Sequence, residues 1–84
     1  MAKRVPTMRE MADALALLGF AGPAVRRDHV VFVHPASDTL VILPKLRPNQ
    51  SVGQARVAAI RLSLIGREVA TPEQFDDALN GVHA

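Results

Sequence analysis

The stretch VVFVHPASDTLVIL, residues 30–43, decides the fold of this chain. Two runs of β-branched and apolar residues, Val30–Val33 and Thr39–Leu43, flank the turn-forming segment Pro35–Asp38. Such runs on both sides of a turn are typical of paired strands, so the stretch predicts a β-hairpin. A shorter apolar run before it predicts a third strand over Ala24–Arg27.

Alternate residues of the hairpin point to opposite faces of the sheet. Phe32 is its largest residue, so we expect the face of Phe32 to pack against helices. That inner face holds Val30, Phe32, Val41 and Leu43. The outer face holds His29, Val31, Val33, Leu40 and Ile42. An outer face this apolar is unusual for the open side of a sheet, and it predicts that a second copy or another protein covers Val31, Val33, Leu40 and Ile42.

Helices are predicted on both sides of the strands from capping boxes, in which Ser or Thr precedes Glu or Gln by three residues. The boxes begin at Thr7, Ser51 and Thr71, and glycines at Gly19, Gly66 and Gly81 are expected to end the helices. The second helix, about Val52–Ile65, is apolar on most of its circumference. Part of it is therefore expected to meet another surface.

The element order is α-β-β-β-α with a short additional C-terminal helix. It predicts an α+β domain of two layers, a three-stranded antiparallel sheet with helices on one face. The 84 residues are expected to form one domain with an ordered core of about 7–80 and loose ends at 1–5 and 82–84. A core of this size stabilises a fold only modestly, which favours a homodimer.

The composition argues against several classes of protein. Cysteine is absent, so disulfides and thiolate metal sites are excluded. No apolar run reaches the roughly 20 residues of a membrane span, and the start MAKRVPT lacks the apolar stretch of a signal peptide. We expect a cytoplasmic protein without a membrane partner. No nucleotide-binding or metal-binding motif occurs, so no cofactor or metal is expected.

Charge is divided unevenly along the chain. Residues 1–67 hold all ten Lys and Arg residues with four acids, a net charge of +6, and residues 68–84 hold the other four acids, a net charge of −4. A basic body favours a polyanion such as RNA or DNA as its partner. A solvated surface followed by an acidic final helix accounts for the same distribution.

His29 is the candidate for chemistry, whereas His34 is expected to serve the turn that follows it. The cations near His29 in the predicted hairpin are Arg26, Arg27, Lys45 and Arg47. Cations hold a phosphodiester, and cleavage of RNA without a metal needs a group that moves protons near neutral pH, as imidazole does. A strand-end histidine with a structural or binding role fits the same residues, so both interpretations stay open.

In the order of its motifs, the chain resembles the HicA toxins, also called YcfA-like proteins. These are small mRNA interferases with a fold like that of double-stranded-RNA-binding domains (dsRBDs). The resemblance covers roughly Met8–Leu79. The segments that carry it are LLGF (17–20), DHVVFVHP (28–35), LVILP (40–44) and TPEQFDDAL (71–79). In the family these places hold a glycine followed by an aromatic residue, a Gly-Ser/Thr-His strand running to His-Pro, a third strand and a closing helix.

The resemblance implies the toxin of a type II toxin-antitoxin system, an endoribonuclease that cleaves mRNA without a metal. The family's catalytic histidine aligns with His29. The residues that would position the RNA backbone are Arg26, Arg27, Lys45 and Arg47. A HicB-like antitoxin would cover His29 and the outer face of the sheet.

The chain departs from the family directly before the histidine, where Arg27-Asp28 replaces Gly-Ser/Thr. A carboxylate at this place either opposes an approaching phosphate or favours the protonated imidazole. The alternative to a toxin is a module of the same fold that binds RNA or a protein partner, or forms a homodimer, without cleaving.

Overall fold

The computed structural model describes residues 5–83, the last two by their backbone alone, so the expectation of loose ends at 1–4 and 84 lies outside the described residues. The elements, in order, are α1 (Met8–Leu17), β1 (Ala21–Val25), β2 (His29–His34), β3 (Thr39–Pro44), α2 (Gln54–Gly66) and α3 (Pro72–His83). The strands form one antiparallel sheet in the order β1-β2-β3. This architecture confirms the predicted α+β class.

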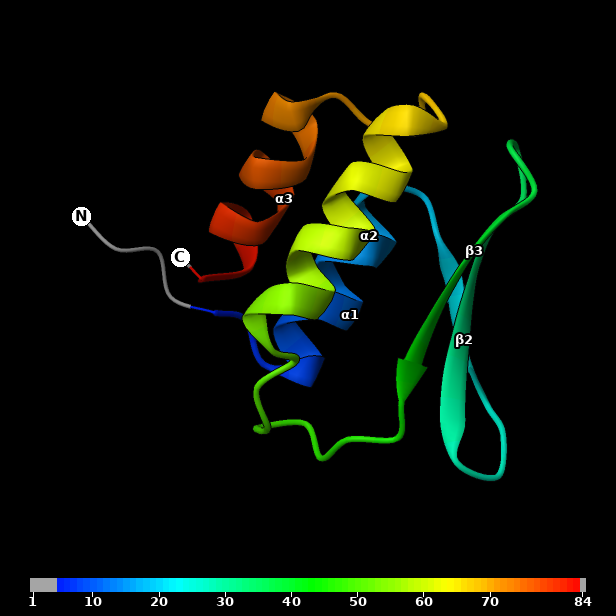
Figure 1. Cartoon of the computed structure of the whole chain (residues 1–84), viewed down its shortest axis with the longest axis vertical. Coiled ribbons are helices and arrows are strands. Elements are labelled where there is room, and N and C mark those ends of the chain that lie inside the picture. The colour runs from blue at the N-terminus through cyan, green and yellow to red at the C-terminus, as the bar shows by residue number, and fades with distance from the viewer. Residues whose placement is uncertain (1–4, 84) are drawn as a thin grey trace.

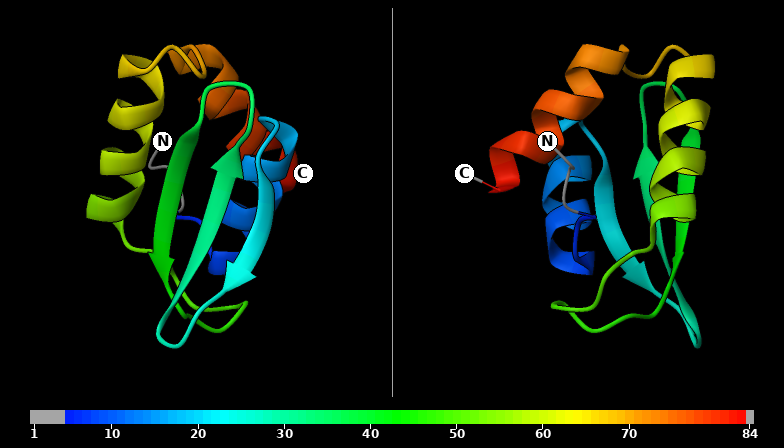
Figure 2. Two further views of the ribbon diagram at one scale, coloured as in Figure 1. Left: turned by 90° about the vertical axis from the view of Figure 1, so that its right-hand side faces the viewer. Right: turned by 60° about the vertical axis from the view of Figure 1, so that its left-hand side comes forward.

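The helices lie on one side of the sheet. Figure 1 shows α1 and α2 beside the sheet, with α3 packed on α1 and farther from the strands. The opposite face of the sheet is open, and it faces the viewer in the left panel of Figure 2. Any chemistry on this open face is therefore presented away from all of the described helices.

The register of the hairpin confirms the predicted faces. β2 and β3 pair without a break from His29 opposite Pro44 to His34 opposite Thr39. The inner-face residues are buried, and they are Val30, Phe32, Val41 and Leu43. On the outer face, Leu40 is 54% exposed and Ile42 is 60% exposed. The sheet therefore presents an apolar surface, as the alternation predicted.

The predicted bounds of the first strand are wrong, because β1 lies earlier in the chain and Arg26 already belongs to the turn into β2. The Arg26 N–H donates to the carbonyl of His29 at 2.8 Å, which closes that turn. Gly22 (φ +122°) makes the earlier pairing feasible, because a Cβ there would lie 2.8 Å from the carbonyl oxygen of Val31. The dipeptide Gly22-Pro23 is typical of a turn between strands. Here it lies within β1, whose pairing with β2 is irregular.

Two of the three predicted capping boxes are confirmed. At the start of α1, the Thr7 N–H donates to Glu10 Oε1 at 2.9 Å, and the Glu10 N–H donates to Thr7 Oγ1 at 3.2 Å. At the start of α3, the same reciprocal pair joins Thr71 and Gln74 at 2.9 and 3.1 Å. Both helices therefore begin where the local sequence satisfies their first free N–H groups.

The box at Ser51 is wrong, because α2 begins at Gln54 after Gly53 (φ +95°). Ser51 Oγ instead accepts a hydrogen bond from the Gly53 N–H at 3.2 Å. Val52 is fully buried, and its N–H donates to the carbonyl of Pro6 at 3.0 Å. The segment before α2 is thus held in extended form by the N-terminal segment, which a local motif cannot reveal.

Helix ends follow the predicted glycines only in part. Gly19 (φ +95°) follows α1, as expected of a glycine stop. α2 ends at Gly66, but the left-handed residue beyond it is Glu68 (φ +59°). α3 runs past Gly81 to His83, so the predicted stop is wrong. A glycine inside a helix costs only about 1 kcal/mol, which packing overrides.

The apolar core lies between the inner face of the sheet and the helices. Its largest fully buried side chains are Phe32, Phe75, Met11, Leu15, Leu43 and Leu64. On α2, Ile60 and Leu64 are buried whereas Leu62 is 69% exposed. The apolar residues of α2 therefore do not all face the core, as its sequence predicted.

We expect Glu68→Gly to stabilise the fold by about 1 kcal/mol, because a left-handed backbone costs a residue with a Cβ roughly that much. The N–H groups of Glu68 and Val69 donate to the carbonyls of Ile65 and Leu64 at 3.0 and 2.9 Å, and glycine keeps these bonds. Urea unfolding measures the change. Arg67→Gly is the matched control, since Arg67 has φ −90°. Equal stabilisation by both variants would contradict the backbone argument.

Candidate functional site

His29 lies at one end of the sheet and on its open face. It is the first residue of β2, opposite Pro44, and its side chain is 41% exposed. The backbone around it is held on both sides: the His29 carbonyl accepts from the Arg26 N–H at 2.8 Å, and the Asp28 carbonyl accepts from the Lys45 N–H at 3.3 Å. The imidazole therefore has a defined place that solvent and a ligand can reach.

Asp28 is the hydrogen-bond partner of this imidazole. Its Oδ1 lies 3.0 Å from His29 Nδ1. The hydrogen bond from His29 holds the pKa of the Asp28 carboxyl below its ordinary value, so the group is an ionised carboxylate at neutral pH. A carboxylate only accepts hydrogen bonds, so Nδ1 carries the proton and the neutral imidazole keeps its lone pair on Nε2. Nε2 is thus the nitrogen that can take up a proton.

The structure gathers the predicted cations at the same end of the molecule. Arg26 and Arg27 form the turn between β1 and β2, and Lys45 follows β3, with its N–H on the Asp28 carbonyl. Arg47 lies farther along the loop between β3 and α2, which leaves the sheet at this end (Figure 1). These four cationic residues are exposed to solvent. We call this group of cations around His29 the basic end.

Two further exposed arginines lie beside the loop between β3 and α2, and the sequence did not predict their place. Arg9, in the first turn of α1, is exposed, and its N–H donates to the carbonyl of Pro48 at 3.0 Å. Arg56, in the first turn of α2, is exposed, and its Nη1 donates to the carbonyl of Val52 at 3.2 Å. The local sequence carries no signal for this proximity, because it depends on where the loop crosses the helix starts.

His34 has the structural surroundings that were expected of it. Its Nδ1 lies 2.7 Å from Ser37 Oγ, and the Ser37 hydroxyl donates to Thr39 Oγ1 at 2.8 Å. Thr39 is 1% exposed, so the network satisfies a buried hydroxyl. The His34 ring also packs on Phe20, with 5.1 Å between ring centroids. His34 therefore stabilises the turn between β2 and β3.

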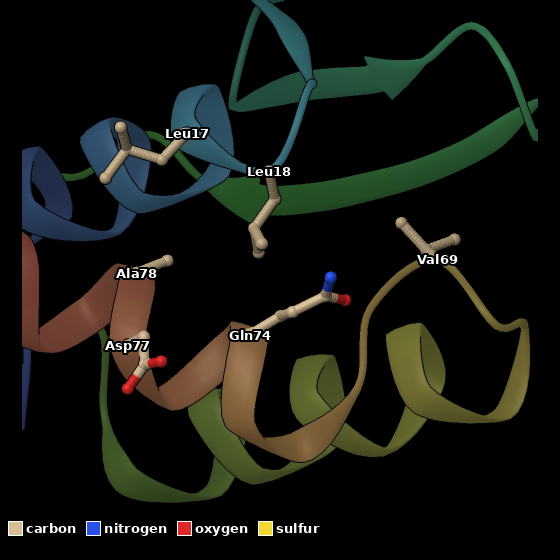
Figure 3. Close-up of a pocket in the computed structure, with 6 residues that line it drawn as sticks. All are labelled: Leu17, Leu18, Val69, Gln74, Asp77 and Ala78. Atoms are coloured by element: carbon tan, nitrogen blue, oxygen red, sulfur yellow. The ribbon is translucent and has the colours of Figure 1, made fainter.

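A surface pocket of about 430 Å³ lies away from the basic end, beside the end of α1 and the start of α3 (Figure 3). Its lining residues are Leu17, Leu18, Val69, Gln74, Asp77 and Ala78. None of the predicted site residues contributes to this lining. Among the side chains that the structure describes, those of residues 5–81, no three of His, Asp or Glu converge to hold a metal ion. No helix in the described part of the chain is long and apolar enough to cross a bilayer.

No family model matches the chain, and neither a curated protein nor a solved structure matches it. The residues of the basic end and the chemistry that they can perform are therefore the guide to function.

Proposed function

We propose that the chain is a HicA-like mRNA interferase, a metal-independent endoribonuclease that acts as the toxin of a type II toxin-antitoxin system. One observation carries the proposal. The imidazole of His29 is half-exposed on an open sheet face, its Nδ1 is held by a carboxylate, and exposed basic residues lie in the turn before it and in the loop after β3. This combination offers a proton acceptor beside a binding surface for phosphates.

The chemistry follows from the chain's own groups. His29 Nε2 takes the proton of a ribose 2′-OH, and the 2′ oxygen attacks the adjacent phosphorus. The new bond joins the 2′ oxygen to phosphorus, and the bond from phosphorus to the 5′ oxygen breaks. The imidazolium then returns the proton to the leaving 5′ oxygen. The products are a 2′,3′-cyclic phosphate and a 5′-hydroxyl.

The cations of the basic end support the proposal, because the reacting phosphate gains negative charge as the 2′ oxygen attacks. Guanidinium and ammonium groups hold a phosphodiester by charge-assisted hydrogen bonds and stabilise such developing charge. The residues assigned to this role are Arg26, Arg27, Lys45 and Arg47. The required 2′-OH restricts the reaction to RNA.

The partner surface of the proposed toxin is the open sheet face beside His29. It consists of Val31, Val33, Leu40 and Ile42. Val31 and Val33 are half-buried, and Leu40 and Ile42 are more than half exposed. A HicB-like antitoxin bound there would bury apolar area and cover the imidazole. Binding of the antitoxin would therefore also inhibit RNA cleavage. A second copy of the chain is the other occupant that this face suits.

The purified protein, incubated with excess EDTA, is expected to cleave single-stranded RNA and to leave DNA of the same sequence intact. The 2′-OH is the nucleophile in the proposed reaction, so DNA lacks the reacting group. End analysis of the fragments should show 2′,3′-cyclic phosphates. RNA that stays intact at high protein concentration overturns the proposal.

The basic end also supports a second function, RNA binding without cleavage. Binding through phosphate contacts weakens steeply as the salt concentration rises. Salt-dependent binding of RNA that remains uncut would identify this binding module. A stable dimer that binds no RNA at low salt would identify a homodimerising module instead.

A further inference from the structure

We propose that Asp28 is the positioning residue of His29: its carboxylate fixes the Nδ1–H tautomer and so presents Nε2 to the reacting 2′-OH. The catalytic consequence rests on the proposed function, whereas the tautomer can be tested without any cleavage. Asp28, which departs from the Gly-Ser/Thr pattern of the HicA family, then contributes to the function of the site.

The backbone holds the Asp28 carboxylate beside the ring. The Asp28 carbonyl is bound by the Lys45 N–H at 3.3 Å, which adds one bond beyond the last residue pair of β2 and β3. The neighbouring turn is closed by the Arg26 N–H and the His29 carbonyl at 2.8 Å. Two backbone bonds therefore hold the main chain of both residues, and their side chains meet at 3.0 Å between Oδ1 and Nδ1.

The other described imidazole is a natural comparison. The Ser37 hydroxyl donates to Thr39 Oγ1, so it accepts from His34 Nδ1, and this ring also carries its proton on Nδ1. Its Nε2 faces Gly19, where a Cβ would lie only 3.4 Å away, and its ring packs on Phe20. His29 has a partner that can only accept and a ring on the open face. The two histidines therefore share a tautomer and differ in the place of the ring, because the ring of His29 lies on the open face whereas that of His34 packs on Phe20 and faces Gly19.

Asp28 also has an electrostatic effect that opposes RNA binding. Its side chain is 84% exposed and carries a negative charge among the cations of the basic end. A carboxylate that only repelled phosphate would slow the reaction, and its removal would speed cleavage. A positioning carboxylate gives the opposite result, because its removal frees the imidazole to adopt the tautomer with the proton on Nε2. The two roles therefore predict changes of opposite sign.

The test is Asp28→Asn, with Asp28→Glu as the conservative variant. An amide can accept from or donate to Nδ1, so ¹⁵N NMR of neutral His29 should show the Nδ1–H form in the wild type and a mixture in the Asn variant. We expect kcat for RNA cleavage to fall by about tenfold in Asp28→Asn, part of the usual contribution of acid–base catalysis. KM should stay the same or fall, because a repelling charge is lost. Asp28→Glu should restore much of kcat.

Contrary outcomes are distinct. Equal or faster cleavage by Asp28→Asn overturns the positioning role and identifies Asp28 as a repelling charge. If the wild type cleaves no RNA, the proposed function fails, but the NMR measurement still tests whether Asp28 determines the tautomer of His29. Identical mixed tautomers in the wild type and in Asp28→Asn would then overturn the proposal by themselves.

Discussion

Replacing Phe75 by alanine is expected to remove most of the stability of the fold at 25 °C. Phe75, in α3, is completely buried and belongs to the same apolar cluster as Phe32 and Leu64. Removing a buried phenylalanine costs about 3–5 kcal/mol, through the lost apolar contact and the cavity that remains. A domain of this size has a total stability on the order of 5 kcal/mol. Circular dichroism and urea unfolding of the purified variant measure the loss.

The matched control is Asp77→Ala, an exposed position in the same helix. It should change the free energy of unfolding by less than about 0.5 kcal/mol, because surface substitutions away from special contacts usually do. A Phe75→Ala variant that unfolds at the wild-type urea concentration would show that α3 is not part of the cooperative core. A large loss of stability in Phe75→Ala would show that the packing of α3 on α1 is needed for the whole fold.

The sequence predicted the hairpin well because its information is local. Alternation along Val30–Val33 and Thr39–Leu43 determines which side chains share a face, whatever the rest of the chain does. The failures have distant causes. The Ser51 box is overridden because the Val52 N–H bonds to Pro6, more than 40 residues earlier in the chain. Gly22-Pro23 reads as a break locally, yet Gly22 is what lets β1 approach β2.

The candidate site divides in the same way. His29 and the cations of the hairpin could be placed together because antiparallel strands bring the residue before one strand next to the residue after the other. The place of Arg9 beside the loop between β3 and α2 could not be predicted, because it depends on the bond from the Met8 N–H to the carbonyl of Gln50 at 2.8 Å, across the fold. The contact between Asp28 and His29 depends on the conformation of one turn, which no residue pattern specifies.

Substituting His29 by glutamine is expected to lower kcat for RNA cleavage by about 10²–10⁴-fold, the usual contribution of a positioned acid–base group. Glutamine keeps a side chain that can hydrogen bond to Asp28, but its amide does not take up a proton near neutral pH. RNA binding at low salt should change little, since the cations of the basic end remain. Initial rates with labelled single-stranded RNA, and binding measured on a 2′-deoxy analogue, separate the two effects.

His34→Gln is the matched control, the same substitution made at the histidine that stabilises the turn. It should lower the free energy of unfolding by about 1 kcal/mol, because the hydrogen bond to Ser37 and the contact with Phe20 are weakened. Its kcat should stay within about twofold of the wild type, since general acid–base catalysis requires a group within reach of the reacting proton. Equal losses of kcat in both variants would mean that folding, not proton transfer, limits activity. A loss confined to His29→Gln places the chemistry on the open face of the sheet.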